Sequence, residues 1–461
     1  MEQSTSFKHK IDFLLSNTSL SPLSQTTVKL KYKKKKCNEC NKRRKITDEN
    51  HQICHICHKM KPLFKPSGSK IIDDFIRHTQ INYVRKEGKL EFIPYDQFKN
   101  LEFIAEGGFS KIYKGIWKDG PISKWDNKSN TRQCDYTVAL KKLNDSKDIT
   151  HKGLNELKIF YDFSLKWKAS RMYSSYKYIS NYFGITRDPV TEDIMIVMPY
   201  YNSGDLIYYI TKVFYEIKWE EKLKNLIKII IGLMNIHSVN IVHRDLHSGN
   251  IFFDNTKSAI IGDLGISKSA TESTDDNNNE NYGIIPYMAP EIFHGQKYTK
   301  ASDIYSFGMV MWELMTGRRP FWDRNHDTEL IIEICDGLRP PIVTNAPGDY
   351  IELMQKCWHS DPEKRPDAYN IYQSIHKIFN NEWNNHFRKQ EPTKIIESSD
   401  IGPVSINAPG AIYKSRPLSA IINSAMSLKI SRKISRSRSI KISKSRLIDT
   451  DYISRELEFD I

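Results

Sequence analysis

The chain has 461 residues, of which 39% are hydrophobic and 27% are charged, a balance typical of globular rather than fibrous or disordered proteins. This length exceeds that of an ordinary single domain and indicates several regions. No run of about 18 apolar residues occurs, so we expect no membrane span. The formal net charge of +14 is concentrated near the two ends, where it favours acidic partners such as nucleic acid or an anionic surface.

Cysteine usage and the start of the chain bear on the compartment. Four of the seven cysteines lie close together, and the other three are scattered. The first 24 residues carry polar residues throughout and lack the apolar core of a signal peptide. This pattern favours a reducing compartment, so we expect an intracellular, cytoplasmic protein, with the nucleus as the alternative.

Residues 1–36 are predicted to be a disordered basic arm. They are rich in Ser and Thr and end in a lysine run from Lys29 to Lys36. We interpret this run as solvated charge; nuclear import and RNA contact are the alternatives.

Two Cys-x-x-Cys pairs follow the arm: Cys37 with Cys40, then, after thirteen residues, Cys54 with Cys57. This is the spacing of a four-cysteine zinc site, in which each pair directs two thiolates at one ion. We therefore expect a zinc-binding module over residues 37–60, which must fold around its metal because it is too short for a core. His51, His55 and His58 offer alternative nitrogen ligands, and the alternative to a metal site is a flexible arm with free surface cysteines. Residues 61–97 read as a linker, with a capping helix near residues 71–83.

The most informative stretch is residues 243–250, which read His-Arg-Asp-Leu-His-Ser-Gly-Asn. Asp245 is placed to accept a proton from a hydroxyl, and Asn250 to hold a metal ion on a phosphate. Phosphoryl transfer needs both within a few ångströms, because its catalysis is mostly positioning and charge neutralisation. The stretch resembles the catalytic loop of eukaryotic protein kinases.

The resemblance extends to a glycine-rich hairpin upstream. The family pattern is Gly-x-Gly-x-x-Gly-x-Val. Here Ala105 replaces the first glycine, Gly107 matches the second, Ser110 replaces the third, and Ile112 stands for the valine. By resemblance, this hairpin covers the phosphates of ATP with backbone amides. Taken alone, the pattern also fits an ordinary Gly-Gly hairpin turn.

The strand after the hairpin, residues 136–141, resembles the Val-Ala-Ile-Lys strand of kinases. The resemblance implies that Ala139 packs on adenine and that Lys141 reaches the α- and β-phosphates. It also implies that Glu156, on a helix predicted over residues 152–165, holds this lysine in place. Strand alternation puts Lys142 on the opposite face.

Two further nucleotide elements are implied by the resemblance. A buried strand over residues 195–201 runs into the hinge, with Met198 as gatekeeper and the backbone of Pro199 and Tyr201 contacting adenine. Residues 262–265 read Gly-Asp-Leu-Gly, in which Asp263 would hold Mg²⁺ or Mn²⁺ on the β- and γ-phosphates.

Three residues of the second half match structural positions of the family. Asp303 corresponds to the buried aspartate that anchors the catalytic loop. Glu291, in an Ala-Pro-Glu triplet, and Arg365 correspond to an ion pair that locks the lobe. Hydroxyl residues between Ser267 and Tyr282 are candidate sites for an upstream activating kinase, through Arg244.

The acceptor residue is less strongly indicated. Serine/threonine kinases usually carry Lys where His247 stands and Thr where Ile284 stands. Leu264 and the Cys357-Trp358 pair are similar to the tyrosine-kinase-like group. This group resemblance favours Ser/Thr and leaves tyrosine or dual specificity open.

Residues 381–461 form the last region, and Lys or Arg, Ser and Ile alternate over residues 428–447. We expect a disordered, basic, serine-rich tail. Alternatives are a segment phosphorylated by basic-directed kinases and a tether to an anionic surface.

Together these features predict an α+β chain with a bilobal protein kinase domain over residues 98–380: a small antiparallel-sheet lobe with one helix and a larger helical lobe. We expect an ATP- and Mg²⁺-dependent protein kinase in intracellular signalling, acting on protein substrates. The alternatives are a pseudokinase scaffold and a protein that binds nucleic acid or a partner through the cysteine module and basic arms.

Overall fold

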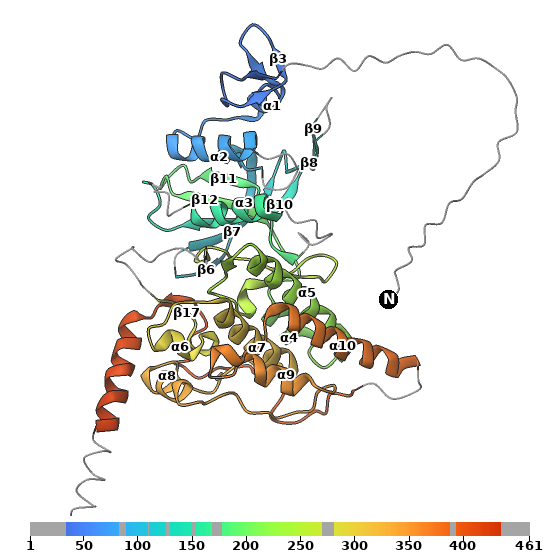
Figure 1. Ribbon diagram of the computed structural model, residues 1–461, viewed down its shortest axis with the longest axis vertical. Coiled ribbons are helices and arrows are strands. Elements are labelled where there is room, and N and C mark those ends of the chain that lie inside the picture. The colour runs from blue at the N-terminus through green and yellow to red at the C-terminus, as the bar shows by residue number, and fades with distance from the viewer. Residues whose placement is uncertain are drawn as a thin grey trace, which may run out of the picture. The chain divides into compact units, whose positions relative to one another are not determined.

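The computed structural model places most of the chain in two units, Met1–Lys59 and Met60–Ile461 (Figure 1). No helix among the placed residues is both long enough and apolar enough to cross a bilayer. The structure describes residues 34–82, 89–108, 110–125, 130–148, 154–167, 178–269, 281–387 and 393–434.

The first unit consists of two short hairpins and one helix turn. Strand β1 (Lys35–Lys36) pairs with β2 (Arg43–Arg44), and β3 (Ile46–Asp48) pairs with β4 (Ile53–Cys54). Helix α1 (His55–Met60) follows directly. The buried hydrophobic residues of this unit are Cys37, Ile53, Cys54 and Cys57, so apolar burial contributes little to folding.

The small lobe of the second unit is built on a six-stranded sheet with the order β5-β11-β12-β10-β7-β6. All neighbours are antiparallel except β5 and β11, which are parallel. The strands are β5 (Glu91–Phe92), β6 (Phe98–Glu106), β7 (Ser110–Trp117), β10 (Tyr136–Leu143), β11 (Gly184–Arg187) and β12 (Ile194–Pro199). Between β7 and β10 lies an antiparallel pair of β8 (Ile122–Trp125) and β9 (Asn130–Arg132).

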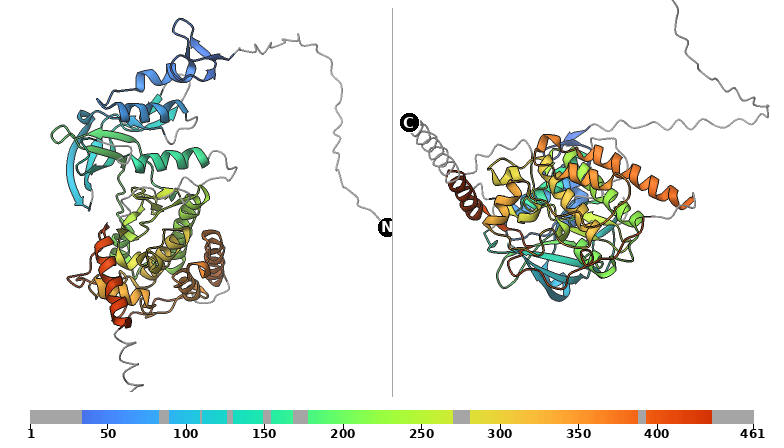
Figure 2. Two further views of the ribbon diagram at one scale, coloured as in Figure 1. Left: turned by 60° about the vertical axis from the view of Figure 1, so that its left-hand side comes forward. Right: turned by 90° about the horizontal axis from the view of Figure 1, so that it is seen from below.

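Two helices lie along one face of this sheet, α2 (Lys70–Asn82) and α3 (Asn155–Trp167) (Figures 1 and 2). Ile72 of α2 and Phe160 of α3 belong to one apolar cluster with Ile196 of β12. The opposite face packs a separate cluster that includes Val138 and Leu140. Lys141 therefore lies on the helix side of β10, as strand alternation requires.

The large lobe is mainly helical. Helix α5 buries Leu223, Leu226, Ile230 and Leu233 at helical spacing, and each buried leucine or isoleucine contributes about 1.5–3 kcal/mol. Its helices are α4 (Leu206–Val213), α5 (Trp219–Ser238), α6 (Pro290–Phe293), α7 (Lys300–Thr316), α8 (Thr328–Cys335), α9 (Tyr350–Cys357) and α10 (Ala368–Phe387). Its short strands are β13 (Ile241–Val242), β14 (Ile251–Phe253), β15 (Ala259–Ile261), β16 (Lys268–Ser269) and β17 (Tyr282–Gly283).

The disorder predicted from residue 381 does not hold over residues 393–434, which pack on the large lobe. Ile401, Leu418 and Ile422 are buried there, strand β18 (Arg416–Pro417) pairs with β17, and residues 419–434 are helical. The physical reason is apolar spacing: Leu418, Ile422 and Met426 recur every four residues and give the helix one apolar face. The predicted arm up to residue 33 and the tail from residue 435 lie outside the described residues.

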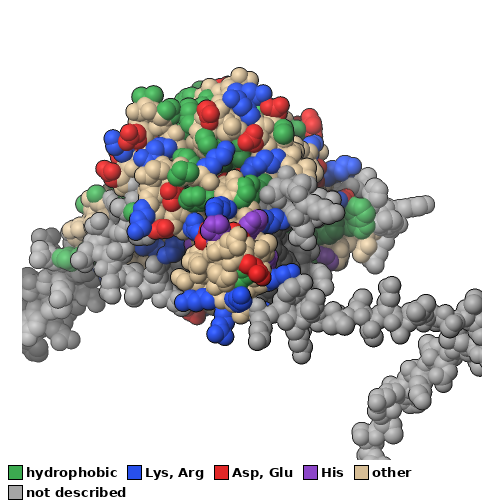
Figure 3. Space-filling view, turned by 90° about the horizontal axis from the view of Figure 1, so that it is seen from above, with side chains coloured by type: hydrophobic (Ala, Val, Ile, Leu, Met, Phe, Trp, Pro, Cys, Tyr) green, Lys and Arg blue, Asp and Glu red, His purple; other side chains and the backbone are tan. Residues whose placement is uncertain are grey.

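The surface drawn in Figure 3 carries Lys and Arg side chains intermixed with Asp and Glu side chains among the described residues. Mixed charge of this kind is typical of a solvated protein face.

Candidate active site

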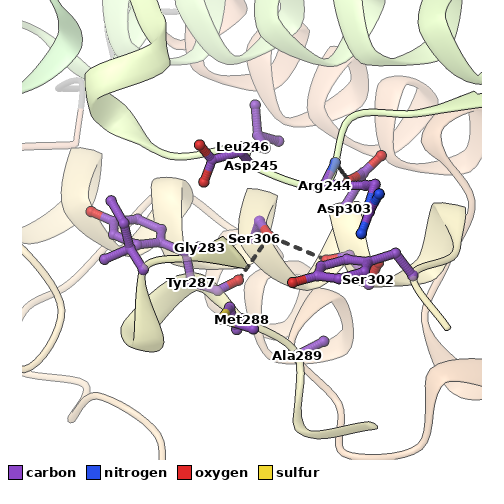
Figure 4. Close-up of a pocket in the computed structure, with 12 residues that line it drawn as sticks. Arg244, Asp245, Leu246, Gly283, Tyr287, Met288, Ala289, Ser302, Asp303 and Ser306 are labelled. Atoms are coloured by element: carbon purple, nitrogen blue, oxygen red, sulfur yellow. Dashed lines mark hydrogen bonds between the residues drawn. The ribbon is translucent and has the colours of Figure 1, made fainter. Parts of the chain in front are cut away.

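The loop that carries Asp245 is fixed from below by Asp303 of helix α7. The Asp303 carboxylate accepts backbone N–H bonds from His243 at 2.8 Å and Arg244 at 2.9 Å, and lies 2.8 Å from His237 Nε2. Arg244 has a φ of 73°, a conformation that non-glycine residues adopt only when their surroundings enforce it. Figure 4 shows Asp303 beside Arg244, with Asp245 on the same loop. Asp303 thus has the position that the sequence predicts.

Asp245 and Asn250 lie together at the two ends of this loop. The Asn250 side-chain amide donates to the Asp245 backbone oxygen at 2.9 Å and lies 3.4 Å from Asp245 Oδ2. Burial alone would raise the pKa of Asp245, but His247 and a hydrogen bond from Ser415 outweigh burial and lower it. Asp245 is therefore ionised at neutral pH and able to accept a proton.

Lys141, Glu156 and Asp263 form one ion-pair cluster, although they are far apart in sequence. Lys141 Nζ lies 3.0 Å from Glu156 Oε2 and 2.6 Å from Asp263 Oδ1. Strand β10 supplies the lysine, helix α3 the glutamate, and the segment after β15 the aspartate. The hydroxyl of Tyr182 donates to Glu156 Oε1 at 2.7 Å and braces this carboxylate from the other side.

Two members of this cluster, Lys141 and Asp263, are charged at neutral pH, whereas burial raises the pKa of Glu156. Burial would lower the pKa of Lys141, but the carboxylates of Asp263 and Glu156 outweigh burial and raise it. Burial would raise the pKa of Asp263, but the Lys141 ammonium outweighs burial and lowers it. Lys141 is thus held protonated and Asp263 ionised, the states that phosphate and metal binding need.

Asp263 and Asn250 also offer oxygens that suit a magnesium ion. Lys141 and the Gly265 N–H contact Asp263 Oδ1, and the Asn250 amide N–H is used within the loop. Within the described part of the chain, no hydrogen bond to Asp263 Oδ2 or Asn250 Oδ1 is found. The backbone links the segments that carry these two residues, because the N–H of Gly262, next to Asp263, donates to the backbone oxygen of Asn250 at 2.8 Å. Hard oxygen donors of this kind are what Mg²⁺ prefers.

The glycine-rich turn connects β6 and β7. Ala105 pairs with Ile112 across this hairpin, and the Gly107 N–H donates to the Ser110 oxygen at 2.8 Å. At Gly108, an added Cβ would lie 2.7 Å from the backbone oxygen of Ser415, so the tail passes close to the turn. Phe109 lies outside the described residues.

The hinge continues from strand β12. Ala139 pairs with Met198, and Val138 pairs with Pro199, which has no N–H and offers only its carbonyl. The carbonyl of Tyr201 accepts from the Gly204 N–H at 3.0 Å, and among the described residues no backbone hydrogen bond from the Tyr201 N–H is found. The Tyr201 ring turns away and stacks on Phe252, with ring centroids 5.4 Å apart.

A pocket adjoins Asp245 on the large lobe. Catalytic-loop residues 244–246, the segment that follows β17, and Ser302, Asp303 and Ser306 of helix α7 line it (Figure 4). Strand β17 borders this pocket with its backbone. Because β17 pairs with β18, the segment that passes beside Asp245 in this structure belongs to the chain itself.

The predicted ion pair of the large lobe is bidentate and buried. The two guanidinium nitrogens of Arg365 each lie 2.7 Å from a Glu291 oxygen, and the two side chains are 0% and 4% exposed. The same guanidinium donates to the backbone oxygens of His359 and Ala301. The pair thus ties α6 to the start of α7 and to the turn before α10.

The sequence predictions omit three residues that the structure places at the site. Tyr182 braces Glu156, His237 contacts Asp303, and Ser415 contacts Asp245. Position in the chain gave no signal for Tyr182 or Ser415. His237 could have been found, because it ends the apolar helix that leads into the catalytic loop. Of the proposed activation sites, residues 270–280 lie outside the described residues.

The first unit brings together the four predicted cysteine ligands. The sulfurs of Cys37, Cys40, Cys54 and Cys57 all lie within 4.8 Å of one another. Cys40 Sγ and Cys54 Sγ are 3.8 Å apart, the separation of about 3.8 Å expected for two thiolates on one tetrahedral zinc with Zn–S bonds of about 2.3 Å. The donor set therefore fits zinc.

Comparison with known proteins gives consistent matches over the second unit. A family model for protein tyrosine and serine/threonine kinases matches residues 98–375. A Dictyostelium discoideum protein described as a serine/threonine-protein kinase is 30% identical over 303 residues, which cover 65% of this chain and 16% of that protein. A protein of Acanthamoeba polyphaga mimivirus, described as a serine/threonine-protein kinase/receptor, is 29% identical over 61% of this chain and 16% of its own length.

A third relative is stress-activated protein kinase alpha of Dictyostelium discoideum, 26% identical over 67% of this chain and 47% of its own length. The chain thus spans less than half of each of these relatives. The family match begins at β6 and ends within α10, so it includes every predicted nucleotide and catalytic residue. This chain belongs to the protein tyrosine and serine/threonine kinase family.

Proposed function

We propose that the chain is an active protein kinase, which transfers the γ-phosphoryl group of ATP to hydroxyls of protein substrates, with Ser and Thr favoured. Protein kinases in general use ATP and Mg²⁺. The observation that carries the proposal is that Lys141 forms ion pairs with both Glu156 and Asp263, next to a loop that holds Asp245 and Asn250. A pseudokinase commonly lacks one of these charged groups.

Each residue has a separate task in this proposal. Lys141 binds the α- and β-phosphates, Glu156 positions the lysine, and Asp263 with Asn250 holds the metal ion. Magnesium, when bound, neutralises charge on the phosphates. Asp245 orients the acceptor hydroxyl and takes its proton.

The nucleotide pocket uses the remaining predicted residues. Ala139 and Met198 enclose adenine, and the Pro199 carbonyl and Tyr201 N–H contact its edge. The hairpin with Ala105, Gly107 and Ile112 covers the phosphates.

His247 supports a serine/threonine acceptor. Its Nδ1 accepts the Gly249 N–H at 3.1 Å, so the neutral ring carries its proton on Nε2, 3.7 Å from Asp245 Oδ2. A donor near the catalytic aspartate is what lysine provides at this position in serine/threonine kinases. Together with Leu264 and Cys357-Trp358, this supports the tyrosine-kinase-like group.

The test is incubation of the purified chain with γ-labelled ATP, Mg²⁺ and casein, followed by identification of the labelled residues. We expect label on serine and threonine of casein, dependent on Mg²⁺ or Mn²⁺. Label confined to tyrosine would contradict the acceptor preference. Nucleotide binding without transfer to any protein would contradict the kinase proposal and establish the pseudokinase alternative.

We also propose that the cysteine module binds one structural zinc ion. The proximity of the four sulfurs supports this, and His51, His55 and His58 are not part of that group. The module has almost no apolar core, so the metal would supply most of its folding free energy.

Metal analysis checks the zinc proposal. The full chain is expected to contain one zinc per molecule, and Cys54→Ser to lose most of it, whereas Cys134→Ser, a change at an exposed cysteine, should keep it. Chelation should increase amide hydrogen exchange over residues 34–59. A zinc-supplied chain that contains no zinc, or a Cys54→Ser variant that retains it, would rule the site out.

A further inference from the structure

Residues 393–434, here called the C-terminal strap, follow the surface of the large lobe back to the active site (Figures 1 and 2). The Gly402 N–H donates to the Thr316 oxygen at 2.7 Å, and Arg318 Nε donates to the Gly402 oxygen at 3.0 Å. Further along, the Ala408 N–H donates to the Trp322 oxygen at 2.9 Å. These bonds fix the path of the strap past the end of helix α7.

A second group of contacts fixes the strap just before Ser415. The His326 N–H donates to the Gly410 oxygen at 2.9 Å, and the Ile412 N–H donates to His326 Nδ1 at 3.1 Å. The hydroxyl of Tyr413 donates to the Pro320 oxygen at 2.8 Å. The His326 ring also lies close to two carbonyl oxygens, with Nδ1 2.9 Å from that of Ile412 and Nε2 3.2 Å from that of Phe321.

The strap is fixed again directly after Ser415. Strand β18 pairs antiparallel with β17, and the Leu418 N–H donates to the Asn281 oxygen at 2.7 Å. Leu418 is 1% exposed. The helix of residues 419–434 then reaches α8, where Arg432 makes a bidentate ion pair with Glu329 at 2.9 and 2.7 Å.

Ser415 lies between these anchors, and its hydroxyl donates to Asp245 Oδ2 at 2.6 Å. Its backbone oxygen lies beneath Gly108 of the glycine-rich turn. The hydroxyl is thus held where an acceptor hydroxyl must be, on the ionised carboxylate of the catalytic loop and next to the phosphate-covering turn.

We propose that Ser415 is phosphorylated by the active site of its own molecule. This inference rests on the proposed kinase function, which supplies ATP. The Ser415 Oγ–P bond forms, the bond between the γ-phosphorus and the β,γ-bridging oxygen breaks, ADP leaves, and the hydroxyl proton passes to the Asp245 carboxylate. No other reactant is needed.

The geometry favours an acceptor over a simple plug. A segment that only blocks the site needs no hydroxyl at this position, whereas here the hydroxyl is the group that contacts Asp245. The anchors on both sides raise its effective concentration far above that of a free peptide. After transfer, a phosphate of charge about −1.5 to −2 would lie beside the Asp245 carboxylate. The repulsion between these two groups would weaken the binding of the strap at the active site.

The first experiment maps phosphorylation of the full chain after incubation with ATP and Mg²⁺, over a 100-fold range of protein concentration. We expect phosphate on Ser415, with a fraction modified per minute that is independent of protein concentration. Ser415→Ala should lose this site, whereas Ser415→Thr and Ser424→Ala, a change at an exposed hydroxyl of the same strap, should keep phosphorylation at position 415. Casein phosphorylation by Ser424→Ala should equal that of the wild type.

The second experiment mixes the active chain with a mass-tagged, full-length Asp263→Asn copy. We expect position 415 of the tagged copy to stay below one tenth of the phosphorylation of the active chain. Equal phosphorylation of both copies would overturn the intramolecular reaction. A chain that phosphorylates casein but leaves Ser415 unmodified would overturn the acceptor assignment while the proposed kinase function stands; no transfer to any protein would remove the proposed function itself.

Discussion

Replacement of Asp263 by Asn is expected to reduce the rate of phosphoryl transfer to casein by at least about 100- to 1,000-fold. The substitution keeps the size of the side chain but removes the charge that contacts Lys141 at 2.6 Å and that would hold the metal ion. Because the Asp263 carboxylate acts on charge that develops during phosphoryl transfer, the reduction in rate should appear in kcat. The measurement is the initial rate at saturating ATP and Mg²⁺.

The matched control for this variant is Asp145→Asn in the small lobe. Asp145 is exposed and has a φ of 51°, a backbone conformation that asparagine also adopts readily. It should retain wild-type activity. An Asp263→Asn variant with more than half of the wild-type rate would contradict the role given to this carboxylate.

Replacement of Arg365 by Ala is expected to lower the free energy of unfolding by about 3–5 kcal/mol. The change would leave Glu291 as a buried carboxylate without its partner, and it would also remove the donors to His359 and Ala301. The measurement is the midpoint of urea denaturation, followed by a signal from the second unit.

The control here is an exposed pair on helix α9. Lys356 and Glu352 are 58% and 64% exposed, so Lys356→Ala should leave the midpoint unchanged within error. If Arg365→Ala unfolded at the same urea concentration as the wild type, the buried pair would not stabilise the lobe.

The parts of the site encoded by short motifs could be predicted from the sequence. Asp245 and Asn250 share one loop, so a local pattern was enough to place them together. Lys141, Glu156 and Asp263 come from separate elements, so no local pattern places them together. Their common site was predicted from the order of the family motifs along the chain. The structure brings these three into direct contact.

Contacts that depend on the tertiary path of the chain could not be predicted. Tyr182 braces Glu156 from the segment before β11, which carries no motif. The basic composition of the tail predicts disorder. The prediction gave this composition more weight than the four-residue spacing of Leu418, Ile422 and Met426, which indicates a helix. Ser415 reaches Asp245 because anchors at both ends of the strap fix its path, and no local pattern encodes that distance.

The measurement that tests the central claim most directly is a crystal structure of the full chain with a non-hydrolysable ATP analogue and Mg²⁺. We expect an Mg²⁺ ion about 2.0–2.2 Å from oxygens of Asp263 and Asn250, and Lys141 Nζ hydrogen-bonded to an α- or β-phosphate oxygen. The γ-phosphate should face Asp245. A nucleotide bound in a different cavity, or a metal ion held by neither Asp263 nor Asn250, would contradict the proposed site.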